Sequence, residues 1–295
     1  MELNKLFSDI SPRLNINNVN VDELAEELKE KIELSRLVQK KFFADLNDGK
    51  IVPYYQPKVD ISNNTICSSE ALSRWFTNDE EILPPNKFIP ILEQYGYICE
   101  LDFYMLNKVC KDIKEQLEKG IEPVTVSINF SRYHFIDQKV DFSFIKRIIS
   151  TIFNYAIDTK YIEIEFTEAG MLEDYTIINK FVEILHLYGI KVSIDDYGKG
   201  YSSLELLLQV PFDIIKMDKS FVDKYNTENG NVILSSTIDM MKKLGKTVIC
   251  EGIENEDQLN YLKNINCDVV QGYYYDKPLP KEDYEKRLLC KKYSK

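Results

Sequence analysis

The stretch "DYTIINKFVEILHLYGIKVSID", residues 174–195, decides the fold because it sets a helical pattern directly before a strand. Over residues 174–189 the apolar side chains fall near helical spacing, and Gly189 stands where a helix cap is expected. Residues 191–195 are typical of a strand. A helix that leads straight into a strand is the unit from which parallel sheets with helical crossovers are built.

The same alternation continues through most of the chain. Strands rich in Val, Ile and aromatic residues are predicted at residues 124–130, 161–166, 191–195, 212–218, 247–252 and 268–275. Two further extended segments, 52–60 and 65–75, are joined by the turn-like sequence "ISNN" and should run antiparallel to each other. Eight strands that alternate with helices predict an α/β fold, namely a modified (β/α)8 barrel of the TIM type with one antiparallel strand near the start.

The segment before the first strand divides into two parts. Residues 1–20 form a polar lead, and residues 21–49 have the apolar spacing of a long amphipathic helix. Such a helix could cover the barrel or contact a partner chain. The barrel is expected over residues 50–290, with no second domain and no internal repeat.

Composition and charge restrict the function classes. The chain has 295 residues, of which 44% are hydrophobic and 29% charged, as is ordinary for a globular protein. A net charge of −11 argues against a broad phosphate-tracking surface, so no DNA or RNA partner is expected. No run approaches the roughly 20 apolar residues that span a bilayer, and the start lacks a secretory signal pattern. We therefore expect a cytoplasmic protein without membrane contact.

Histidine and cysteine offer little material for catalysis or metal binding. The chain contains 2 histidines, and its 6 cysteines are scattered without a C-x-x-C pair. Zinc sites and Ser-His-Asp schemes are therefore disfavoured, and the cysteines are expected to be reduced. Any metal chemistry must rely on oxygen ligands.

Acidic or amide side chains recur at the carboxyl ends of the predicted strands: Glu70, Asn129, Glu165, Glu168, Asp195, Asp196, Glu251 and Gln271. In a barrel these ends converge on one face, where barrel active sites are built. Carboxylates gathered without counter-charges repel one another, so the arrangement calls for cations that prefer oxygen, namely Mg²⁺, Mn²⁺ or Ca²⁺. A single Asp-Asp pair is more often a helix cap or a turn. The repetition at several strand ends favours a metal site.

Lys216 lies inside the otherwise apolar strand sequence "IIKMD". Burying its ammonium group is costly unless carboxylates or a substrate phosphate compensate the charge. A purely structural ion pair with a neighbouring acid is the alternative.

From about residue 45 to residue 280 the chain resembles the EAL domain family of bacterial cyclic di-GMP phosphodiesterases. The matching stretches, in order, are "YYQPKVD", "SEALSRW", "FIPILEQYG", "VSINFS", "IEIEFTE", "SIDDYGKGYSSL", "VPFDIIKMDKSFV", "CEGIENEDQL" and "VQGYYYDKPLP". "SEAL" alone would be weak, but the ordered set is specific.

The resemblance implies roles for particular residues. The expected metal ligands are Glu70, Asn129, Glu165 and Asp195 for one ion, with Asp195 shared with a second ion that Asp196 also holds. The residues expected to hold or activate the attacking water are Glu251, Lys216 and Gln271, with Glu251 either the general base or a ligand of the second ion. Glu168 would anchor the "DDYGKG" loop, and the residues expected to line the nucleotide are Gln56, Arg74, Asp218 and Pro278.

The resemblance further implies hydrolysis of cyclic di-GMP to linear pGpG by a water that two Mg²⁺ or Mn²⁺ ions activate, in a homodimer. Ca²⁺ is expected to inhibit, because it is larger and polarises bound water less. The alternative is a catalytically silent receptor or protein-interaction module. Four residues depart from the usual family pattern: Tyr197, Lys199, Met217 and Cys250. Of these, Lys199 bears on regulation rather than on the chemistry.

Overall fold

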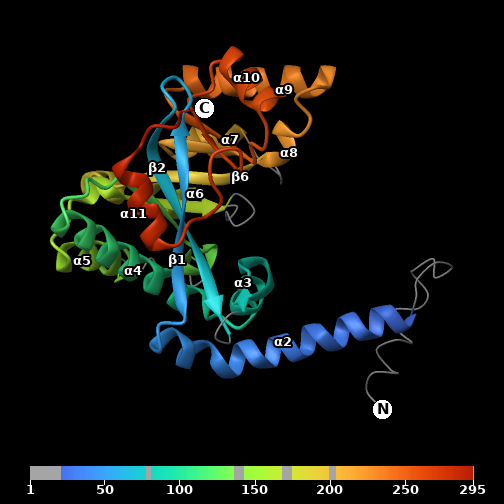
Figure 1. The fold of residues 1–295 in the computed structure, drawn as a ribbon, viewed down its shortest axis with the longest axis vertical. Helices are drawn as coiled ribbons and strands as arrows, with labels where there is room; N and C mark the ends of the chain where they lie inside the picture. Colours follow the sequence, from blue (N-terminus) through green and yellow to red (C-terminus); the bar gives the residue numbers. More distant parts are fainter. Residues whose placement is uncertain (1–20, 78–80, 136–142, 168–174, 199–203, 295) are drawn as a thin grey trace.

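The computed structural model describes residues 21–77, 81–135, 143–167, 175–198 and 204–294 (Figure 1). Its strands are β1 (Ile51–Asp60), β2 (Thr65–Phe76), β3 (Ile82–Leu83), β4 (Thr125–Asn129), β5 (Ile162–Thr167), β6 (Lys191–Tyr197), β7 (Ile214–Met217), β8 (Thr247–Glu251) and β9 (Val269–Gln271). The strand order is β1-β9-β8-β7-β6-β5-β4-β2-β3, and pairing of β1 with β2 closes the barrel. The predicted α/β barrel is therefore confirmed.

Strand β1 is the antiparallel member of the barrel. It runs antiparallel to β2 on one side and to β9 on the other, whereas the neighbouring pairs from β2 through β4 to β9 are parallel. The tight connection between β1 and β2 forces this direction. The backbone N–H of Ser62 donates to Asp60 Oδ1 at 2.8 Å, and Asn64 takes a positive φ of 56°. The predicted antiparallel strand near the start is thus present.

Two strands are several residues shorter than predicted, the other boundaries differ by one or two residues, and one strand was not predicted. The strand expected over residues 268–275 stops at Gln271, since at Gly272 the chain presses against another backbone segment. A Cβ added to Gly272 would lie 2.2 Å from the carbonyl oxygen of Ile253. Strand β7 is likewise shorter than residues 212–218. The unpredicted strand is β3, whose two residues pair with the end of β2.

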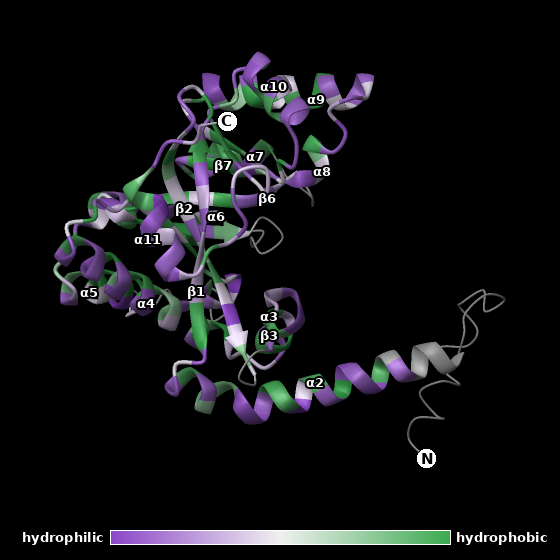
Figure 2. Cartoon of the chain, in the orientation of Figure 1, coloured by the Kyte–Doolittle hydropathy of each residue, from purple (hydrophilic) through white to green (hydrophobic). Residues whose placement is uncertain are grey.

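Helices surround the barrel (Figure 1). They are α2 (Val21–Asn47), α3 (Pro85–Gln94), α4 (Ile98–Glu118), α5 (Ser143–Asn154), α6 (Tyr175–Leu187), α7 (Leu204–Gln209), α8 (Lys219–Val222), α9 (Glu228–Lys243), α10 (Glu256–Asn264) and α11 (Lys281–Leu289), with short 3-10 turns at Arg132–Phe135 and Thr159–Tyr161. Figure 2 shows hydrophobic residues on the strands and a mixture of both kinds along the helices. The main apolar core thus lies between the strands and the helical layer.

Helix α2 packs on the rest of the protein through its second half. Val38 and Phe42 are buried there, and Trp75 Nε1 donates a hydrogen bond to Asp45 at 3.0 Å. In the first half, Leu28 and Ile32 are exposed, and that part of the helix projects beyond the barrel (Figure 1). Among the described helices, none has the length and apolar character needed to cross a bilayer.

Candidate functional site

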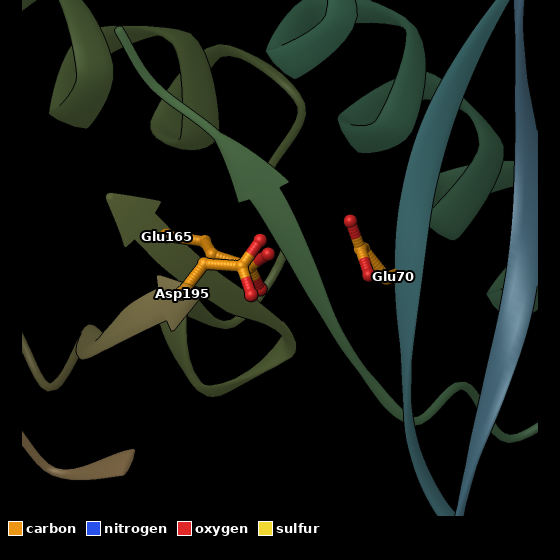
Figure 3. A group of neighbouring side chains, drawn as sticks. All are labelled: Glu70, Glu165 and Asp195. Carbon is orange, nitrogen blue, oxygen red and sulfur yellow. The ribbon is translucent and has the colours of Figure 1, made fainter. Parts of the chain in front are cut away.

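The carboxyl ends of the parallel strands bring the predicted metal ligands together. Because side chains alternate along a strand, Glu165 on β5 faces the inside of the barrel, and the parallel register sets Asn129 on β4 beside it. Oxygen atoms of Glu70, Glu165 and Asp195 lie within 4.8 Å of one another. Figure 3 shows Glu165 and Asp195 pointing toward Glu70, which comes from β2. Three strands that are distant in sequence therefore supply one group of carboxylates.

A second group of carboxylates overlaps the first. Asp195, Asp196 and Glu251 also place oxygens within 4.8 Å of one another, so Asp195 belongs to both groups. Adjacent strand residues normally point to opposite faces, but the register between β6 and β7 shifts between Ile194 and Tyr197. Asp196 has a positive φ of 56°, which costs energy for a residue with a side chain. This irregularity lets two consecutive aspartates serve the same site.

Lys216 occupies the centre of these carboxylates. Its buried Nζ lies 2.6 Å from Glu165, 2.7 Å from Glu251, 3.0 Å from Asp195 and 3.1 Å from Glu70. Burial alone would lower the pKa of Lys216, but the surrounding carboxylates, Asp195 foremost, raise it well above its usual value. The ammonium group therefore stays charged and joins the four strand ends.

The carboxylates of the site differ in their electrostatic environments. Burial raises the pKa of Asp195 well above its usual value, with repulsion from Glu251 and Glu165 adding to the effect against Lys216. Burial also raises the pKa of Glu251. Burial acts in the same direction on Glu165, but two ammonium groups, those of Lys216 and Lys58, outweigh it and lower its pKa to about 2. An added cation would relieve the repulsion at Asp195 and Glu251.

Two amide side chains donate hydrogen bonds to Glu70, and a third contacts one of these two. Asn129 Nδ2 donates to Glu70 Oε1 at 2.9 Å, and Gln271 Nε2 donates to Glu70 Oε2 at 2.8 Å. Gln271 Nε2 also donates to Gln56 Oε1 at 3.1 Å. Gln271 Oε1 is buried and finds no hydrogen-bond partner among the described residues. It is thus an acceptor available to a water or a cation.

Two cavities meet at the carboxylates, and both are lined by Glu70, Leu72 and Asp195. One has a volume of about 260 Å³ and a largely apolar wall that includes Ile89 and Met105. The other, of about 370 Å³, is lined by polar and aromatic residues: Gln56, Lys219, Glu251, Glu254, Gln271 and Tyr273.

The remaining predicted residues make other contacts or lie outside the described part. Arg74 donates to the Ser73 carbonyl and lies over the Tyr54 ring. Asp218 caps α8 by accepting a hydrogen bond from Ser220 N at 2.9 Å. Pro278 precedes Leu279, whose backbone pairs with Tyr55 on β1. Glu168 and Lys199 lie outside the described residues, so the anchoring of the "DDYGKG" loop stays a prediction.

Lys58 was missed as part of the site. It lies on β1, is fully buried and places its Nζ 3.4 Å from Glu165 Oε2. The signal was present, because a lysine in the sequence "YYQPKVD" stands two residues after Gln56 and therefore on the same face of the strand. A lysine buried at this position needs carboxylate partners for the same reason as Lys216.

Known proteins of similar sequence identify the family of the chain. A sequence profile of the EAL domain matches residues 39–278. The chain is 32% identical over 81% of its length to the oxygen sensor protein DosP of Escherichia coli K12, and 33% identical over 83% of its length to the probable cyclic di-GMP phosphodiesterase PdeG of the same organism. It spans only 29% of DosP and 48% of PdeG.

A solved structure of similar fold is the PaMucR phosphodiesterase in complex with c-di-GMP. It has a TM-score of 0.77 and 26% sequence identity, and the match covers 84% of this chain and 99% of that one. The profile match over most of the chain, together with relatives above 30% identity, shows that the chain belongs to the EAL domain family of cyclic di-GMP phosphodiesterases.

Proposed function

We propose that this chain is a metal-dependent phosphodiesterase that hydrolyses cyclic di-GMP to linear pGpG. The observation that carries the proposal is the pair of overlapping carboxylate groups that share Asp195, at the junction of two cavities. Family membership supplies the substrate class.

The donor set fits Mg²⁺ or Mn²⁺. Carboxylate and amide oxygens are the ligands that these ions prefer, and the unpartnered Gln271 Oε1 adds an acceptor nearby. Glu70, Asn129, Glu165 and Asp195 would hold one ion, and Asp195 with Asp196 would hold a second. When bound, such ions polarise the phosphodiester and lower the pKa of water.

Residues of the chain itself accept the proton and stabilise the developing charge. Glu251, whose oxygens lie with those of Asp195 and Asp196, would accept a proton from the attacking water or hold the second ion. Lys216 holds the carboxylates in place and supplies positive charge next to the reacting phosphate. Gln271 fixes Glu70 through its amide nitrogen. Proton acceptance and charge stabilisation thus fall to residues on neighbouring strands.

The two cavities suit the two nucleotide halves of the substrate. The apolar wall of the smaller one favours a guanine base, and Tyr273 in the larger one offers an aromatic face for stacking. Gln56 lines the larger cavity, and we propose that Arg74, Asp218 and Pro278 contact the nucleotide beyond it. The guanidinium of Arg74 suits phosphate or a base edge. On the resemblance alone, we also propose a homodimer that acts in the cytoplasm.

The reaction is tested with purified protein, cyclic di-GMP and either Mg²⁺ or Mn²⁺, with chromatography to follow pGpG. We expect product only when a divalent ion is present, and EDTA-treated protein serves as the control. Binding of cyclic di-GMP by calorimetry without product in any tested metal would contradict the proposal. That outcome would favour the alternative of a catalytically silent receptor.

A further inference from the structure

A second buried lysine, Lys58, lies beneath the carboxylate site. Its side chain comes from β1 and is 0% exposed. Nζ donates to Ser127 Oγ at 2.8 Å and lies 3.5 Å from Glu163 Oε1 and 3.4 Å from Glu165 Oε2. The ammonium group therefore bridges three strands, β1, β4 and β5, inside the barrel.

The two oxygens of Glu165 are divided between two lysines. Lys216 Nζ lies 2.6 Å from Oε1, whereas Lys58 Nζ lies 3.4 Å from Oε2. Oε1 is thus the oxygen that lies among the other carboxylates, and a charged partner holds Oε2 away from them. Oε1 accepts the hydrogen bond of Lys216 with one lone pair, so its second lone pair can face a cation.

Glu163 explains why a lysine is needed at this depth. It stands two residues before Glu165 on β5, so both carboxylates face the inside of the barrel, and both are almost completely buried. Two buried carboxylates without a partner would be strongly unfavourable. Lys58 lies against both of them, and Lys216 supplies a second positive charge at Glu165.

We propose that Lys58 is a positioning residue that holds Glu165 through Oε2 and so prepares Oε1 as a metal ligand. This inference rests on the proposed function, since it concerns the same metal site. The competing explanation is a structural ion pair that stabilises the barrel interior and leaves metal affinity unchanged. The two explanations differ in what happens to metal binding when the charge pair is removed without leaving a buried charge.

The test compares Lys58→Met/Glu163→Gln with Glu163→Gln alone. The double variant removes one positive and one negative charge, which buried sites often tolerate, whereas the single variant keeps Lys58 next to Glu165. Mn²⁺ binding is measured without substrate by electron paramagnetic resonance, and thermal unfolding is followed in parallel. We expect Mn²⁺ affinity to fall roughly 10–100-fold in the double variant, as for other residues that orient a metal ligand, and to stay near the unaltered value in Glu163→Gln.

Equal Mn²⁺ affinity in the two variants would overturn the role of Lys58 while leaving the proposed function intact. Absence of Mn²⁺ binding by the unaltered protein would overturn both, because the metal site itself would be missing. If the double variant does not fold, Lys58→Gln/Glu163→Gln decides, since it removes the same pair of charges and keeps a polar group at both positions. A loss of affinity of about threefold or more supports the role, and an unchanged affinity overturns it.

Discussion

The two ends of the barrel interior are built from the same strands but serve different purposes. Three strands each contribute two inward-facing residues spaced two apart: Ile214 and Lys216 on β7, Ile249 and Glu251 on β8, and Val269 and Gln271 on β9. The first member of each pair belongs to a small buried apolar cluster that is separate from the main core. The second member lies in the carboxylate site or hydrogen-bonds to it.

The difference shows how one strand can carry both stability and chemistry. One step of two residues, about 7 Å along a strand, takes the chain from apolar packing to a charged site. The apolar cluster requires only side chains of suitable volume and shape, whereas the carboxylate site requires oxygen atoms at particular positions. Substitutions in the carboxylate site should therefore lower turnover, whereas substitutions in the apolar cluster should lower stability.

The largest expected effect on turnover is that of Glu70→Gln in the carboxylate site. The substitution removes a charge from the oxygen group while keeping its size, so turnover should fall roughly 10³-fold with the fold retained. Chromatography of pGpG measures turnover, and circular dichroism checks the fold. A folded variant with nearly normal turnover would show that Glu70 is not a ligand.

Replacing Mg²⁺ or Mn²⁺ by Ca²⁺ should have the next largest effect. Ca²⁺ accepts the same oxygens but prefers longer bonds and more ligands, and misplacement of about 1 Å can cost roughly 10²-fold in rate. Calorimetry should still detect cyclic di-GMP binding in Ca²⁺, while pGpG formation nearly stops. Adding excess Mn²⁺ should start the reaction. Turnover in Ca²⁺ equal to that in Mg²⁺ would contradict the proposed water activation.

The barrel and most of the carboxylate site could be predicted from the sequence for the same reason. Alternating strands and helices predict a parallel sheet, and the ends of parallel strands meet at one face, so Glu70, Glu165 and Asp195 could be placed together without coordinates. Local pattern was sufficient because each of these residues lies on a strand of its own: β2, β5 and β6. The meeting point then follows from topology alone.

Other features depend on contacts between distant residues and could not be predicted. The positive φ of Asp196 and the register shift in β6 are set by pairing with β7, which no local pattern encodes. The early end of β9 depends on the approach of Gly272 to Ile253. Lys58 is a different case, because its position in a strand was visible but only the structure shows Glu163 and Glu165 as its partners.

A bound metal ion should stabilise the folded protein through the carboxylate site alone. A ligand that binds only the folded state adds about 2.7 kcal/mol at 100 times its dissociation constant. Mn²⁺ should therefore raise the melting temperature of the unaltered protein. The rise should shrink in Glu70→Gln and persist in a variant of the apolar cluster, which differential scanning calorimetry can measure. Equal rises in all three proteins would mean that Mn²⁺ binds elsewhere.

The smallest expected effect is that of Ile249→Val in the apolar cluster. Ile249 is 1% exposed and packs with Ile214 and Val269, so loss of one methylene should lower the free energy of unfolding by about 0.5–1.5 kcal/mol. Glu251 stands two residues farther along the same strand, yet its backbone pairing with Gln271 would be unchanged. Turnover per folded molecule should therefore stay within about twofold of the unaltered value, because the substitution removes a single methylene and changes no side chain of the carboxylate site. Urea unfolding gives the stability and a pGpG assay gives the turnover. A large loss of turnover in a stable Ile249→Val protein would show that the two levels of the barrel are mechanically coupled and that their separation, as argued above, is wrong.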